Sequence, residues 1–472
     1  MLNQVEYYKD KNVREHIAEY CGSSSETPGE FTAEYMVGYG EALLWEGRQE
    51  AFISAPKDGF DLLLDKGLDI FRSNWDRTST LGVLDIEYFN LDFPGEVYLN
   101  PERTFELLEP VRFSVRRQLE RFKIPYIEIM TGQGYHFSFK ISRFSAADKK
   151  LEGIGFVAEK LKKRYQMIKG RRKRAVSIRH GKAFEGMGKV LEYAVHTVME
   201  ELAGENFAIP CVITDVSVGK SSRGKREALS FDLSMYGDPI FMRDIRCPFS
   251  THQKNKMQWY KVGKDVADNI APRLALPRND APLKQILAIR TSPEKTIEYA
   301  QTAGCAIPDF SKEFLNLLSS YEASHLRTIH RDFDETRAHT EKEWPETYDM
   351  LDPFTLPECT RLTLLLPNDN MLRPTNIQNL VRVLMCKGWH PRHIAGLVTS
   401  KYERKQYNWT ENWEKYDAAS RANFYVRIFS DLLLTGIDGE LDLNCVSAGE
   451  MNFCLKEWCG WNLSDFKLKG EN

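Results

Sequence analysis

The sequence predicts an α+β protein, with a mixed α/β catalytic domain followed by a mainly helical C-terminal domain. Strand and helix patterns alternate up to about residue 260, strand patterns are sparse after it, and a helical, cysteine-bearing stretch ends the chain. With 472 residues, the chain exceeds one ordinary domain of roughly 100 to 200 residues. We expect a catalytic domain over 1–270, a helical linker region over 271–349 and a helical domain with a cysteine cluster over 350–472.

The composition is that of a globular protein. Apolar residues make up 42% of the chain, which is enough to fill buried cores. No segment reaches the roughly 20 uncharged residues that a membrane-spanning helix requires. The first residues, MLNQVEYYKDKNVREH, lack the basic start and apolar stretch of a secretory signal. We therefore expect a cytoplasmic protein with no membrane partner, in which the nine cysteines do not form disulfides.

Periodic patterns predict the elements of the first part. LGVLDIEYF at 81–89 is typical of a strand, and FELLEPVRFSVRRQLERF at 105–122 repeats its apolar residues at helical spacing. YIEIMTGQGYHFSFKI at 126–141 predicts a strand, a glycine turn and a second strand. Further elements follow in the order helix, helix, strand, turn and strand, near 151–168, 188–202, 211–218, 219–227 and 228–235.

The pattern changes after about residue 262. Prolines at 277 and 282 mark a connector, and the following 70 or so residues are polar and helix-like. A new unit opens near residue 350, at MLDPFTLPECT. Beyond it, the stretches at 373–402 and 409–416 are typical of helices.

Asp85 and Glu87 are two residues apart in the first predicted strand. Because strand side chains alternate between faces, both carboxylates share one face while Leu84 and Ile86 can enter the core. Neighbouring carboxylates repel unless a cation lies between them, and Mg²⁺ or Mn²⁺ prefers such oxygen ligands. Two ions roughly 4 Å apart can serve both oxygens of a phosphoryl transfer. The alternative is a pair of exposed acids on a wet sheet face.

A glycine turn comes next, in the segment TGQGYH from Thr131 to His136. Glycines let backbone N–H groups approach a phosphate, and the threonine hydroxyl and the histidine can contact it as well. A simple hairpin turn is the alternative.

Asp232 follows the apolar strand ending at Phe231, and the segment MRDIRCPFSTHQK comes soon after it. The basic side chains of this segment suit a triphosphate, which carries several negative charges. They are Arg243, Arg246, His252 and Lys254.

In this order, the motifs resemble the catalytic subunit of the archaeo-eukaryotic primases, over roughly residues 40–260. The resemblance implies that Asp85, Glu87 and Asp232 bind two Mg²⁺ or Mn²⁺ ions and carry out catalysis. Glu87 stands where many members of the family have Asp.

The same resemblance implies the nucleotide-binding residues. Thr131 and His136 match a motif that contacts the phosphates of the incoming nucleotide, with Thr in place of the commoner Ser. The basic motif after the third acid is matched by Arg246, His252 and Lys254, with Arg243 as a further candidate.

The implied activity is that of a DNA primase, a nucleotidyltransferase that makes short primers on single-stranded DNA from NTPs or dNTPs. One alternative is a primer-extending polymerase of the same superfamily, used in repair or defence. Another is a catalytically inactive nucleic-acid-binding replication factor, although the acids and the histidine are intact. A replicative helicase is a candidate partner. The run from Lys160 to Arg174 has nine basic side chains and no acid, and suits either the template backbone or a solvated helix face.

Four cysteines of the later part form a second candidate site. Cys359 lies upstream of a compact trio, and thiolates can bind an iron–sulfur cluster or zinc. The trio consists of Cys445, Cys454 and Cys459. One remote cysteine and three near the end, with helices between them, resemble the iron–sulfur domain of the primase large subunit, although the trio is more tightly spaced. A [4Fe–4S] cluster, a Zn²⁺ ion and buried cysteines without a ligand all stay open.

Overall fold

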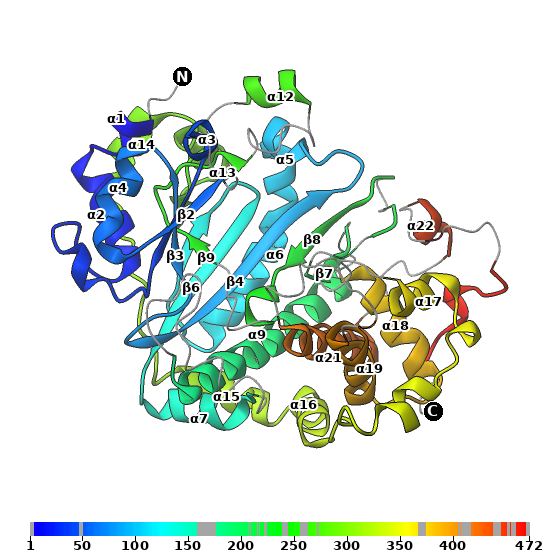
Figure 1. The fold of residues 1–472 in the computed structure, drawn as a ribbon. Coiled ribbons are helices and arrows are strands. Elements are labelled where there is room, and N and C mark those ends of the chain that lie inside the picture. Colours follow the sequence, from blue (N-terminus) through cyan, green and yellow to red (C-terminus); the bar gives the residue numbers. More distant parts are fainter. Residues whose placement is uncertain are drawn as a thin grey trace. The chain divides into compact units, whose positions relative to one another are not determined.

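A computed structural model describes the chain apart from residues 1–3, 47–50, 158–175, 206, 208, 215, 217, 221–223, 238–243, 255–262, 271–272, 367–373, 405, 407–416, 438–444, 451–453, 455–458 and 469–472. The predicted α+β class is confirmed, and the later part of the chain is mostly helical. The chain packs as two compact units (Figure 1). The first comprises Met1–Ala194 and Met242–Leu318, and the second Val195–Phe241 and Ser319–Asn472. The predicted division at residues 270 and 350 stays a prediction.

Antiparallel strands form the core of the first unit (Figure 1). One set follows the order β2-β1-β3-β9 and another the order β10-β5-β6-β4. The strands are β1 Met36–Tyr39, β2 Phe52–Ala55, β3 Asp69–Ser73, β4 Ser79–Asn90, β5 Ile127–Met130, β6 Gly134–Ser142, β9 Asp244–Arg246 and β10 Leu276–Pro277.

Helix α6 packs against β6 because its buried residues recur every three or four positions. The helices of the unit are α1 Gln4–Tyr7, α2 Lys11–Cys21, α3 Glu41–Trp45, α4 Phe60–Asp65, α5 Glu96–Leu99, α6 Pro101–Arg121, α7 Ala146–Ile154, α12 Lys264–Asn269, α13 Leu283–Ile289 and α14 Pro293–Ala300, with 3-10 turns η1 Pro28–Glu30 and η2 Lys57–Gly59. The unit boundaries at residues 194/195 and 318/319 fall within α9 Ile178–Gly204 and α15 Phe314–Glu322.

Strand β4 is the predicted strand at 81–89, extended by a few residues. From Leu84 onward its residues alternate between buried and half-buried, as expected for a strand with one partly solvated face. The register with β6 sets Asp85 opposite His136 and Glu87 opposite Gly134. The two predicted motifs, the acids and the glycine turn, are therefore neighbours in one sheet.

The second unit is built around α21, which packs against α16, α18 and α19. Its helices are α16 His325–Glu335, α17 Glu358–Leu365, α18 Thr375–Cys386, α19 Pro391–Glu403, α21 Ala418–Thr435 and α22 Cys445–Glu450. The 3-10 turns are η3 Ser234–Tyr236, η4 Trp344–Glu346, η5 Tyr348–Met350, η6 Pro353–Thr355 and η9 Leu463–Asp465. Two short strands, β7 Cys211–Ile213 and β8 Glu227–Phe231, pair in parallel.

Three predicted elements differ from the structure. The strand expected at 211–218 ends at Ile213, because Thr214 adopts a left-handed backbone with φ of 63°. The strand expected at 228–235 ends at Phe231 and gives way to η3. The helix expected at 151–168 corresponds to α7, which ends at Ile154. Residues 158–168 of that prediction lie outside the described part, as does the predicted helix at 409–416.

In the part of the chain that the structure describes, no helix is both long enough and apolar enough to cross a membrane.

Candidate nucleotide and metal site

Asp85 and Glu87 project from the same face of β4 and are both half-buried. Their neighbours Leu84, Ile86 and Tyr88 are buried on the opposite face. Asp85 Oδ1 is buried and forms an ion pair with His136. Two carboxylates on one strand face are a fitting donor set for a hard divalent cation.

His136 lies opposite Asp85 on β6, and its Nε2 is 3.1 Å from Asp85 Oδ1. Burial lowers the pKa of His136, but the carboxylates of Asp85 and Glu87 outweigh burial, so the pKa is raised above its ordinary value. Its Nδ1 is buried without a hydrogen-bond partner among the described residues. His136 is thus held next to the acids with one ring nitrogen available to a ligand.

The glycine turn between β5 and β6 is closed by Thr131. Its backbone N–H donates to Gly134 O at 2.8 Å, and its Oγ1 accepts from Gly134 N at 3.2 Å. Since the hydroxyl oxygen is the acceptor, the hydroxyl proton is still available for donation to a phosphate. Gly134 allows close approach to β4, because a Cβ there would lie 1.7 Å from Ile86 O.

Two residues of the basic motif contact the glycine turn. Lys254 Nζ donates to Gln133 Oε1 at 3.1 Å. A Cβ added at Gly132 would lie 2.3 Å from the His252 ring, so glycine is needed for the imidazole to sit against the turn. The structure therefore brings together two motifs that are more than a hundred residues apart in the chain.

Arg246 is held in place by a buried acid that the sequence analysis missed. Its Nη1 lies 3.0 Å from Asp69 Oδ2, and its guanidinium stacks 4.4 Å above the Phe71 ring. Asp69 also accepts hydrogen bonds from Thr251 Oγ1 at 2.7 Å and Gln253 N at 2.8 Å. Asp69 thereby fixes the segment that carries His252 and Lys254.

His252 is buried, and its Nε2 lies 3.2 Å from the Tyr98 hydroxyl. Burial and then four basic neighbours lower its pKa well below 6.5, so the ring is neutral at pH 7. Those neighbours are Arg246, Lys254, Arg290 and Arg273. Tyr98, Arg273 and Arg290 were not predicted from the sequence. The local signal for Arg290 was weak: it follows the apolar run ILAI.

The other predicted residues are Asp232, Arg243 and the basic run at 160–174. Asp232 directly follows β8 in the second unit, where its Oδ1 accepts from Ser234 N at 2.9 Å. Its joining Asp85 and Glu87 at one metal site stays a prediction. Arg243 and the basic run at 160–174 lie outside the described residues.

The four predicted cysteines of the second unit are brought together. Burial, followed by the thiols of Cys454, Cys445 and Cys459, raises the pKa of Cys359 to about 12. Cys445 Sγ and Cys459 Sγ lie 3.7 and 3.9 Å from the same carbonyl oxygen, that of Trp461. Leu463 N also donates to Cys445 Sγ at 3.2 Å. These contacts make the four sulfur atoms a candidate ligand set.

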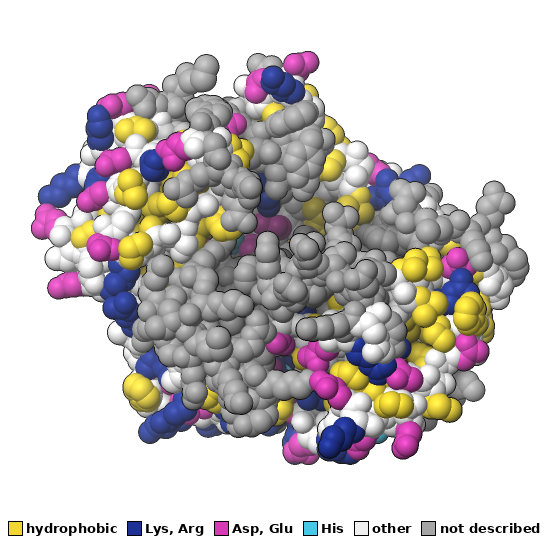
Figure 2. Space-filling view, in the orientation of Figure 1, with side chains coloured by type: hydrophobic (Ala, Val, Ile, Leu, Met, Phe, Trp, Pro, Cys, Tyr) yellow, Lys and Arg dark blue, Asp and Glu magenta, His cyan; other side chains and the backbone are white. Residues whose placement is uncertain are grey.

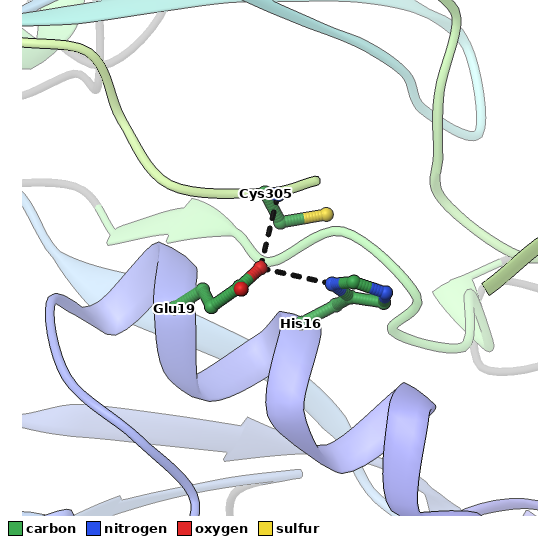
Figure 3. Close-up of side chains that lie close together, drawn as sticks. All are labelled: His16, Glu19 and Cys305. Carbon is green, nitrogen blue, oxygen red and sulfur yellow. Dashed lines mark hydrogen bonds and ion pairs between the residues drawn. The ribbon is translucent and has the colours of Figure 1, made fainter. Parts of the chain in front are cut away.

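A separate cluster in the first unit, His16, Glu19 and Cys305, also has metal-ligating side chains close together (Figure 3). His16 Nδ1 lies 2.9 Å from Glu19 Oε2, and its Nε2 lies 2.7 Å from Ala300 O. Cys305 N donates to the same carboxylate oxygen at 3.1 Å. Both ring nitrogens thus contact oxygen atoms of the protein, so the cluster ties α2 to the chain after α14.

The surface has both signs of charge. On the face drawn in Figure 2, the described Lys and Arg side chains are interspersed with Asp and Glu, in keeping with a net charge of −3. The concentration of positive charge around His252 is therefore a local feature of the site.

Comparisons with protein-family models, with curated proteins and with solved structures give no match to this chain.

Proposed function

We propose that the chain is a metal-dependent nucleotidyltransferase that makes short DNA-templated primers from NTPs or dNTPs. The observation that carries the proposal is the meeting of three motifs in one unit. Asp85 and Glu87 adjoin His136 on the neighbouring strand, and the glycine turn before His136 is contacted by His252 and Lys254.

This arrangement separates two chemical tasks. The acids are suited to holding divalent cations, which when bound would neutralise the charge on the attacking and departing oxygens. The turn offers the Thr131 hydroxyl and the His136 Nδ1, and Lys254 adds a positive charge above Gln133. These groups suit the triphosphate of an incoming nucleotide, because a polyanion is best held by several donors and a cation.

The residues of the chain would act mainly by positioning. A 3′-hydroxyl placed in line with the α-phosphate forms the new phosphodiester bond as the bond to pyrophosphate breaks, and the hydroxyl proton leaves to a base or solvent. Groups aimed at the β- and γ-phosphates stabilise the departing pyrophosphate. Asp232, if it is the third ligand, completes the metal site.

The cysteines of the second unit are proposed to bind a [4Fe–4S] cluster. The contacts that hold the four thiols near one another support a shared thiolate-bound group, and iron and sulfide content decides between the cluster and a single Zn²⁺. A cluster here would fasten the tail that carries Cys445 and Cys459 to α17, which carries Cys359. The role proposed for this unit is to help retain the initiating nucleotide.

One assay tests the proposal. Purified protein is incubated with unprimed single-stranded DNA, labelled NTPs or dNTPs, and Mg²⁺ or Mn²⁺, and the products are separated by length. Short template-dependent products on unprimed DNA are expected. Extension of a supplied primer without initiation would instead identify a primer-extending polymerase. Binding to DNA with no incorporation in either format would overturn the proposal.

A further inference from the structure

Arg290 is a buried cation that has no acidic partner in the described part of the chain. It is 1% exposed and caps the C-terminal end of α13. Its Nη2 donates to Thr131 O at 2.5 Å, and its guanidinium stacks 5.3 Å from the Phe105 ring. Among the described residues, its Nε and Nη1 have no hydrogen-bond partner. A buried charge normally has a counter-ion, since an unpaired one is costly.

The surroundings of Arg290 add further positive charge. Arg273 lies nearby and donates its Nη2 to Tyr98 O at 2.8 Å, and its backbone carbonyl accepts from His252 N at 2.9 Å. Burial and then Arg273 lower the pKa of Arg290 to about 9, which still leaves the guanidinium charged at pH 7. The positive charge of Arg290 therefore has no acidic partner among the described residues.

One further atom at this position has no hydrogen-bond partner among the described residues. It is His252 Nδ1, which is buried, and the His252 ring lies against Gly132. Arg290 holds the carbonyl of Thr131, the residue immediately before that glycine. These unpartnered nitrogen atoms and the charge of Arg290 thus lie next to the same turn.

We infer that Arg290 is a positioning residue for a triphosphate: it fixes the Thr131 carbonyl, and its charge is balanced when the polyanion binds at the turn. This inference rests on the proposed function and extends it to a residue outside the motifs that suggested it. Arg290 acts indirectly. Its buried guanidinium holds the backbone of the turn that would contact the phosphates, and its positive charge attracts those phosphates electrostatically.

The test compares Arg290→Met and Arg290→Lys with the unchanged protein. Binding of ATP, ADP and AMP is titrated at equilibrium with Mg²⁺ and without template. Arg290→Met is expected to weaken ATP binding about 10-fold, because it removes a nearby positive charge that does not contact the phosphates directly, and to weaken AMP binding much less. Arg290→Lys should recover part of the ATP affinity because it keeps the charge.

Arg112→Met is the matched control. Arg112 is also a buried arginine of the first unit, but it pairs with Glu128 and Glu109. Its loss should lower the melting temperature while leaving the preference for ATP over AMP unchanged. If Arg290→Met fails to fold, Arg290→Lys carries the comparison through its intermediate ATP affinity and unchanged AMP affinity.

Failure of this inference can be told apart from failure of the proposed function. Equal losses for ATP and AMP, or unchanged ATP binding in both Arg290 variants, would overturn the inference even if the protein makes primers. A selective loss of ATP affinity in a protein that incorporates no nucleotide on any template would support the phosphate role and overturn the polymerase function.

Discussion

At the scale of single residues, the site contains charged side chains suited to binding a ligand and other side chains whose surroundings hold them in one protonation state. His252 is an example, since burial and its basic neighbours keep the ring neutral in the folded protein. A neutral ring can accept or donate a hydrogen bond without adding to the local positive charge. Asp85 shows the opposite case, a carboxylate that lies beside Glu87 and is paired with His136.

The neutral state of His252 predicts a pH dependence of stability. Below its ordinary pKa of about 6.5, His252 takes up a proton in the unfolded state but not in the folded one. The unfolded state then binds more protons, so the free energy of unfolding falls as the pH is lowered from 6.5 towards 5. The expected slope from this residue is up to about 1.4 kcal/mol per pH unit.

Denaturant titrations from pH 5 to 8 measure this effect. His252→Gln cannot titrate, so its curve should be flatter than that of the unchanged protein by about one proton below pH 6.5. Above pH 7 the two slopes should agree. Parallel curves across the whole range would show that His252 has the same pKa in the folded and unfolded states, which contradicts its burial among basic groups.

A second prediction at this scale concerns the metal ligands. Asp85→Asn keeps the size of the side chain but removes its charge, so nucleotide incorporation should fall at least roughly 100-fold, as a lost metal contact costs several kcal/mol. The fold should persist, since Asp85 is half-buried and lies on the wetter face of β4. Incorporation is measured on primed template, with circular dichroism to monitor the fold.

Glu102→Gln is the control for Asp85→Asn. Glu102 is an exposed acid of the same unit that pairs only with Lys284 at the surface, a contact of small energetic value. Its loss should leave incorporation within about twofold. Near-normal incorporation by Asp85→Asn would remove Asp85 from the catalytic site.

Single residues also mark the limit of what the sequence predicts. Asp85, Glu87 and His136 were found because they lie in local patterns of strand and turn. Arg290 was missed, because a buried arginine far from the motif has the same local appearance as a surface one. Asp69 was missed for the same reason, although it organises the segment before Lys254.

At the scale of elements, the hairpin of β5 and β6 connects the acids to the basic motif. Its position was predictable, since alternation and glycines are local signals. Its contact with His252 was not, since that contact joins distant segments and depends on the missing side chain of Gly132. The same limit applies to β7, whose early end depends on the left-handed Thr214.

The two glycines of this turn should respond differently to substitution. Gly134→Ala would place a Cβ 1.7 Å from Ile86 O, so β4 and β6 must separate locally and the free energy of unfolding should fall by about 1–3 kcal/mol or more. Gly132→Ala would meet the His252 ring, a side chain that can move. It should cost less stability and weaken nucleotide binding, measured by titration of the folded variant.

Each of the two glycine variants serves as the control for the other. Gly134→Ala destabilising the protein no more than Gly132→Ala would contradict the close approach of the turn to β4. Unchanged nucleotide affinity in Gly132→Ala would contradict the role of the His252 contact in phosphate binding.

At the scale of the whole molecule, each compact unit draws on two separate stretches of the chain. Residues 195–241, which carry β7 and β8, belong to the unit that also holds the later helices. Local composition cannot reveal such an exchange, because pattern changes along the chain mark only consecutive segments. The sequence did predict that the later part is mainly helical and that its cysteines lie together.

The cysteine site predicts that loss of its ligand affects initiation but not primer extension. Cys445→Ser removes one of the three thiols around Cys359, so the bound cluster should be lost or depleted. Metal binding contributes on the order of 10 kcal/mol to the folding of small metal sites, so the tail should loosen. Initiation on unprimed DNA should then fail while extension of a supplied primer persists. Iron and sulfide content after anaerobic purification, together with both assays, measure the effect.

Cys386→Ser provides the matched control, since Cys386 ends α18 and is not among the thiols that raise the pKa of Cys359. It should keep the cluster and both activities. The unchanged protein should be brown, with iron and sulfide in equal amounts, because a [4Fe–4S] cluster holds four of each. Stoichiometric zinc in a colourless protein would replace the cluster by a structural zinc site. A folded protein without any metal would remove the site and leave the four thiols as packing, because nothing else would then require them to lie together.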